Sequence, residues 1–143
     1  MIRKFTLGLT FAALMGSASF ADVIEINMLN VGSDGARMVF EPDFVQIAPG
    51  DTIRFLATDR GHNAETLDGM IPAGAEGFVG RINEEIEITL TEDGVYAIIC
   101  KPHYAMGMVM VVAVGDAEVP EGFLEGRIPR QAMTRFEAQL ENL

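Results

Sequence analysis

Residues Val95 to Asp116 read VYAIICKPHYAMGMVMVVAVGD, two apolar runs joined by a short loop that contains the only cysteine of the chain. Both runs are strand-like, because short continuous apolar runs bounded by turns are typical of buried strands. The loop CKPHYAMGM, from Cys100 to Met108, places a thiol, an imidazole and two thioethers within nine residues. It is therefore a candidate metal site, a candidate catalytic thiol or a sulfur-rich turn.

The chain around this segment is built of short strand-like stretches separated by Gly- and Pro-containing turns. Apolar and polar residues alternate over 22–31, 38–48, 52–58 and 85–90, which favours half-buried strands. Pro42 interrupts the second stretch and indicates a bulge, a bend or an edge. About seven short strands at regular spacing predict an all-β protein, a Greek-key β-sandwich or barrel.

The pattern changes beyond Gly115. Ala132, Phe136 and Leu140 recur at every fourth position, which predicts an amphipathic helix packed on the β-domain by its apolar stripe. We therefore expect one domain over residues 22–143, with 118–143 as a helical C-terminal extension.

The first 21 residues have the composition of a secretory signal. Two basic residues precede an apolar run over 5–15, and small residues follow up to Ala21. This order predicts a signal peptide, residues 1–21, that is removed after Ala21. The apolar run is short for a membrane anchor, so we expect an exported protein without membrane insertion, which in a bacterium means the periplasm.

Net charge and cysteine content limit the classes of function that the chain can have. Removing residues 1–21 takes away two of ten basic and none of 21 acidic residues, so the formal net charge falls from −11 to −13. An acidic chain without a basic stripe does not suit nucleic-acid binding. A single cysteine excludes an internal disulfide, leaving a free thiol, an intermolecular bond or a metal thiolate.

Four residues form a candidate metal site: His62, Cys100, His103 and Met108. Two imidazoles and a thiolate, with a weak thioether on the axis, are the ligand set of blue-copper electron-transfer sites. The spacing Cys-x2-His-x4-Met lets one loop supply three of them, and His62 follows another strand that can end at the same pole of the sandwich. Met106 is a rival to Met108, but its spacing fits less well.

Three neighbours support the same interpretation. Pro102 stiffens the loop between Cys100 and His103, and Gly107 permits a sharp turn before Met108. Asn63 directly follows His62, and we expect it to donate a hydrogen bond towards the cysteine sulfur and to pin the two loops together.

Four other functions fit this set of residues less well than a blue-copper site does. A cysteine hydrolase, with Cys100 as nucleophile and His62 or His103 as base, would need no methionine. A closed zinc site would take a hard or thiolate fourth ligand, and c-type haem attachment needs a second cysteine. A copper chaperone would share the ligands but needs an open, exchange-ready site.

Several short motifs occur in an order that resembles the cupredoxins, and specifically the pseudoazurin family: MLN, MVFEP, PGD, GHN, CxPHYAMGM and AVGD. The resemblance covers the chain from about Asp22 to Leu143. It implies a Greek-key β-sandwich with a C-terminal helical extension, and one type 1 copper ion bound by His62, Cys100, His103 and Met108. It also implies a monomeric periplasmic electron carrier, not an enzyme. Its expected partners are a cytochrome donor and a respiratory reductase such as nitrite reductase.

The ligand loop also suggests where electrons leave. We expect His103 to lie nearer the surface than His62 and to be the exit. Around it we expect an apolar docking patch, formed by Met38, Met70, Ile71, Pro72, Pro102, Tyr104 and Met106, with basic residues Arg37, Arg60, Arg81 and Lys101 nearby.

Overall fold

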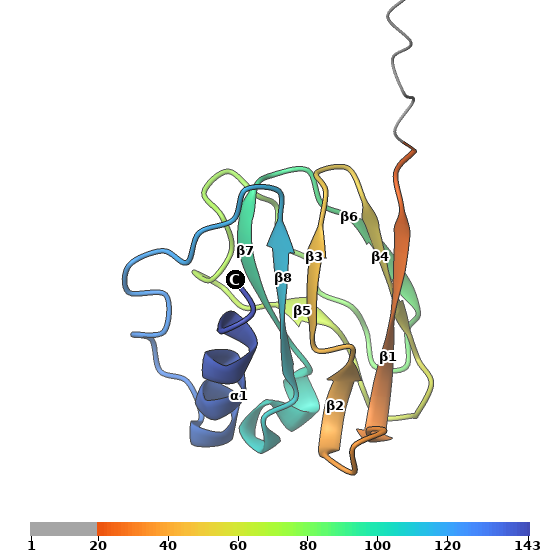
Figure 1. Ribbon diagram of the computed structural model, residues 1–143. Coiled ribbons are helices and arrows are strands. Elements are labelled where there is room, and N and C mark those ends of the chain that lie inside the picture. The colour runs from red at the N-terminus through yellow and green to blue at the C-terminus, as the bar shows by residue number, and fades with distance from the viewer. Residues whose placement is uncertain (1–19) are drawn as a thin grey trace, which may run out of the picture.

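The computed structural model describes residues 20–143, which form two packed β-sheets and one α-helix (Figure 1). The expected signal peptide, apart from its last two residues, lies outside the described part. Among residues 20–143, no helix is long and apolar enough to cross a membrane.

Eight strands form two four-stranded sheets. The first sheet contains, in spatial order, β2 (Arg37–Glu41), β1 (Val23–Val31), β4 (Thr52–Leu56) and β6 (Ile86–Thr89). The second contains β3 (Phe44–Ile47), β8 (Val109–Val114), β7 (Gly94–Ile99) and β5 (Glu65–Thr66). Each sheet has one parallel pair, β1–β4 or β3–β8, and the other pairs are antiparallel. The chain passes from the first sheet to the second at Pro42, between β2 and β3. The predicted β-sandwich is confirmed.

The main core lies between the two sheets. In the first sheet, Ile26 and Met28 of β1 are buried, whereas Glu25, which precedes Ile26 and points to the opposite face, is exposed, as strand geometry requires when one face meets the core. The second sheet contributes Tyr96 and Met110 to the same buried cluster.

β7 and β8 are buried on both faces, which explains why their sequences are continuously apolar instead of alternating. One face meets the first sheet. The other, with Ala97 and Val111, is covered by helix α1 (Arg130–Leu140), which lies beside these strands in Figure 1. Ala132 and Phe136 of α1 are fully buried, so the predicted apolar stripe is confirmed.

The helix predicted from Ala132, Phe136 and Leu140 begins directly after Pro129. α1 has 11 residues, and turns and loop precede it. At the pole where β7 ends and β8 begins, the chain forms the 3₁₀ helix η1 (Lys101–Met106). This helix carries most of the cysteine-containing loop.

Candidate metal centre

The loop between β7 and β8 is held by its own backbone. His103 N–H donates to the Cys100 carbonyl at 3.1 Å, and Met108 N–H donates to the His103 carbonyl at 3.1 Å. Cys100 N–H donates to the Met108 carbonyl at 2.9 Å, which closes the loop at its base. Gly107 ends η1 at φ 85°, a left-handed conformation that glycine adopts without steric cost. A Cβ there would also lie 3.1 Å from the backbone of Gln131 in α1.

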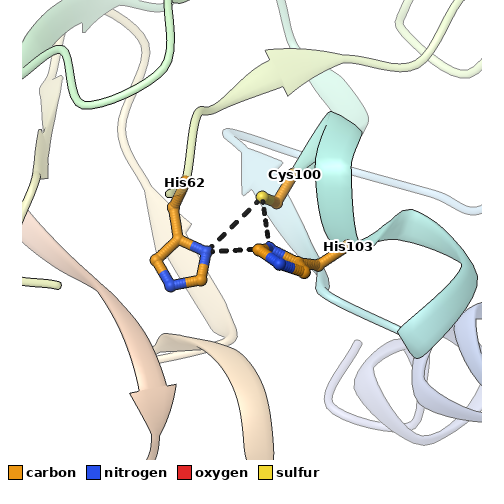
Figure 2. A group of neighbouring side chains, drawn as sticks. All are labelled: His62, Cys100 and His103. Atoms are coloured by element: carbon orange, nitrogen blue, oxygen red, sulfur yellow. Dashed lines mark hydrogen bonds between the residues drawn. The ribbon is translucent and has the colours of Figure 1, made fainter. Parts of the chain in front are cut away.

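Three of the four predicted ligands meet at one point (Figure 2). The Nδ1 atoms of His62 and His103 lie 3.1 Å apart, and Cys100 Sγ lies 3.7 Å from the first and 3.6 Å from the second. Cys100 and His62 are fully buried and His103 is half-buried, so His103 lies nearer the surface, as expected. Met108 is fully buried in the same cluster as Cys100 and is joined to it by the backbone.

The orientation of His62 is fixed by a residue that the sequence did not indicate. His62 Nε2 lies 2.9 Å from Asn30 Oδ1. Because an amide oxygen only accepts, Nε2 carries the proton and the lone pair of Nδ1 faces Cys100 and His103. Asn30 is near the end of β1, which pairs in parallel with β4. Only this pairing brings it to the loop after β4.

Asn63 pins the two loops together, as predicted, but through different atoms. Its Oδ1 accepts from Lys101 N–H at 2.7 Å, and its Nδ2 donates to Gly80 O at 2.9 Å and Glu65 Oε2 at 3.0 Å. The predicted donation by this side chain to sulfur is therefore wrong. The backbone N–H groups of Asn63 and His103 face the sulfur instead and favour its thiolate.

Burial controls the electrostatics of the site. It raises the pKa of the Cys100 thiol, against the lowering effect of the two backbone N–H groups. Burial also lowers the pKa of His62, reinforced by the neighbouring His103. Both shifts favour neutral groups, and a bound soft cation would compensate a thiolate there. The donor set therefore fits copper, whereas a buried thiol of raised pKa is a poor nucleophile for a hydrolase.

The expected docking patch is only partly correct. Pro102 and Met106 are exposed, Met106 at 41%. Met70, however, is buried against the second sheet. Pro72 packs on Gly94 at the start of β7, at the opposite end of that strand from Cys100, so neither residue contributes.

Two exposed apolar side chains near His62 had not been expected. Val79 and Ile82 are 78% and 48% exposed. Their segment joins the His62 loop, because Asn83 N–H donates to the His62 carbonyl at 2.8 Å.

The comparison with known proteins agrees with this geometry. Residues 26–115 match the family described as copper-binding proteins, plastocyanin/azurin family. The chain belongs to this family. It is 44% identical over 138 residues to the pseudoazurin of Paracoccus pantotrophus, covering 94% of each chain. Members of the family carry electrons and are not enzymes, and the cofactor of this protein is a single type 1 copper ion.

Solved structures show the same relationship. Pseudoazurin from Methylobacterium extorquens AM1 is 40% identical with a TM-score of 0.73, over 82% of this chain and 95% of that one. Pseudoazurin from Hyphomicrobium denitrificans is 32% identical with a TM-score of 0.80, over 85% and 98%. A copper-containing nitrite reductase from Thermus scotoductus, 23% identical with a TM-score of 0.51 over 73% of this chain and 25% of that one, shares the fold alone.

Proposed function

We propose that this electron carrier works in the periplasm, with copper held by the Nδ1 atoms of His62 and His103, the Cys100 thiolate and the Met108 thioether. The convergence of the two Nδ1 atoms and Sγ at one buried point carries the proposal. Copper supplies reversible one-electron chemistry when bound by such a set.

The protein residues restrict the site in three ways. Asn30 fixes the tautomer of His62, Asn63 holds the two loops at a constant separation, and burial of Cys100 excludes water from the sulfur. A chaperone that exchanges copper would need an accessible ligand set. The full burial of His62, Cys100 and Met108 therefore favours an electron carrier.

Electrons would pass through His103, the half-buried ligand of the loop. The exposed side chains of Pro102 and Met106 adjoin it, and small apolar contacts allow a partner to dissociate quickly. The family resemblance of the sequence motifs implies the partners: a respiratory reductase such as nitrite reductase as acceptor and a cytochrome as donor. The composition of residues 1–21 supports export to the periplasm, where the protein would act as a monomer.

Copper loading tests the ligand assignment. Cu(II) added to purified residues 22–143 should produce strong visible thiolate-to-copper absorption that disappears in Cys100→Ala. The loop provides a matched pair of methionines. Met108→Leu should shift the spectrum, whereas Met106→Leu should leave it unchanged. Absorption that survives Cys100→Ala, or that responds to Met106 but not Met108, would contradict the assignment.

Electron transfer tests the exit and the partner. Reduced protein mixed with nitrite reductase in a stopped-flow instrument should be reoxidised, and Met106→Lys should slow this step without altering the copper spectrum. Salt dependence of the rate would report charge steering. No reoxidation by the reductase, or an unchanged rate in the variant, would reject the partner or the docking surface respectively. Export predicts a mature protein that begins at Asp22 and is recovered in the periplasmic fraction.

A further inference from the structure

Helix α1 contacts the ligand loop through two side chains one helical turn apart. Arg135 Nη1 donates to the Gly107 carbonyl at 2.7 Å, and Gln139 Nε2 donates to the Val109 carbonyl at 3.0 Å. Side chains four residues apart lie on the same helix face. The two accepted carbonyls belong to the residues immediately before and after Met108.

Met108 is held from the other side by the loop itself. Its N–H donates to the His103 carbonyl and its carbonyl accepts from Cys100 N–H. Together with the two bonds from α1, four polar groups of the backbone between Gly107 and Val109 have fixed partners. The position of its side chain therefore depends on the helix as well as on the loop.

Arg135 also holds a strained segment at the start of β2. Its Nη1 donates to the Met38 carbonyl at 2.6 Å and its Nη2 to the Arg37 carbonyl at 2.8 Å. Met38 has φ 51°, a left-handed conformation that is costly for a residue with a Cβ. The planar guanidinium can serve several carbonyls in fixed directions, so one side chain links β2, α1 and the ligand loop.

The side chain of Gln139 is held by two hydrogen bonds from its amide nitrogen. It is 2% exposed, and besides the Val109 carbonyl its Nε2 donates to Asp43 Oδ2 at 3.0 Å. Asp43 precedes β3, the strand that pairs with β8. The amide thus connects α1 to the first residue of β8 and to the neighbouring strand.

We propose that Arg135 and Gln139 are positioning residues for the copper site. By fixing the backbone on each side of Met108, they set how closely its thioether approaches the metal, and so tune the copper site from outside the ligand set. This inference rests on the proposed role of Met108 as a ligand.

Amide hydrogen exchange tests the positioning directly. In the purified reduced protein, Arg135→Ala and Gln139→Ala should accelerate exchange of the Met108 N–H by about tenfold, the effect expected from losing one supporting hydrogen bond. The matched control is Phe136→Leu, which alters a buried residue between the two on the same helix. It should lower global stability without accelerating Met108 selectively. If Phe136→Leu accelerated exchange of the Met108 N–H as much as the alanine variants do, after the change in global stability is taken into account, Arg135 and Gln139 would have a purely structural role.

The copper-loaded protein gives an independent readout. Arg135→Ala and Gln139→Ala should shift the visible spectrum and reduction potential and weaken Cu(I) binding about tenfold. Arg135→Lys should keep part of the wild-type spectrum, reduction potential and Cu(I) affinity, because an ammonium can still donate to the Gly107 carbonyl but lacks the planar fork. Phe136→Leu should leave the spectrum unchanged. An unchanged spectrum in both alanine variants, or the same shift in Phe136→Leu, would overturn the proposal.

The two readouts separate failure of this inference from failure of the ligand assignment. If the wild-type protein gives no thiolate-to-copper spectrum, the proposed ligand set is wrong, whereas exchange at Met108 still reports whether α1 fixes its backbone. If the spectrum is present but responds only to Met108→Leu, the ligand set stands and the positioning role is rejected.

Discussion

Replacing Asn63 with alanine should destabilise the protein by about 3 kcal/mol. The amide makes three hydrogen bonds, to Lys101 N–H, Gly80 O and Glu65 Oε2, and Asn63 is only 3% exposed. Each bond contributes on the order of 1 kcal/mol, and leaving the partners unpaired away from water adds to the loss. For a domain of this size, about 3 kcal/mol corresponds to a fall in Tm of about 10 °C.

Urea unfolding of wild type and Asn63→Ala measures this change. The midpoint should fall while the slope m stays the same, since the surface exposed on unfolding is unaltered. Asn142→Ala is the matched control, because that exposed amide makes one hydrogen bond, to the Gln139 carbonyl at 2.8 Å. It should change the free energy of unfolding by less than about 0.5 kcal/mol. A loss below about 1 kcal/mol in Asn63→Ala would refute the claim that this side chain joins the loops.

Three further predictions concern single side chains. The Tyr104 hydroxyl is buried without a hydrogen-bond partner among the described residues, so Tyr104→Phe should raise the free energy of unfolding by about 1 kcal/mol, and a lower urea midpoint would contradict this. The Ser33 hydroxyl and N–H donate to the Glu41 carboxylate and lower its pKa. Ser33→Ala should therefore raise the pKa of Glu41, measured by NMR titration. Because a depressed carboxyl pKa stabilises the fold above the unfolded-state pKa and this is lost as pH falls through the folded pKa, the variant should lose less stability on acidification. Asn30→Leu removes the acceptor for His62 Nε2 and should weaken copper binding about tenfold in a chelator competition; unchanged affinity would show that the tautomer needs no such support.

The sequence was sufficient where the physical cause is local. Continuous apolar runs predicted β7 and β8 because both faces of these strands are covered. A four-residue period predicted α1 because one face of the helix meets the sheet. The spacing within Cys100–Met108 placed two of the three converging donors, since one loop carries them.

The sequence was insufficient where distant segments meet. Asn30 lies 32 residues from His62, and only the parallel pairing of β1 with β4 brings them together. Met70 and Pro72 lie outside the expected docking patch for a related reason. The segment before Pro72 runs back along β7, because Leu67 N–H donates to the Ala97 carbonyl and Ala97 N–H to the Met70 carbonyl. That pairing directs the segment away from the metal site, which no local pattern reveals.

The proposed ligands are supported from several independent parts of the fold. Asn30 orients His62, Asn63 joins its loop to Lys101, and Arg135 holds the backbone before Met108. All of these contacts are between protein atoms. Any movement of the ligands when the copper ion changes oxidation state would therefore have to strain or break them. Electron transfer is fast when the ligands move little as the copper ion gains or loses an electron. We therefore expect Asn63→Ala to slow electron self-exchange, measured from NMR line widths of mixed-oxidation samples, even with copper still bound. An unchanged rate together with the predicted loss of stability would show that the loop contacts stabilise the fold without restraining the metal site.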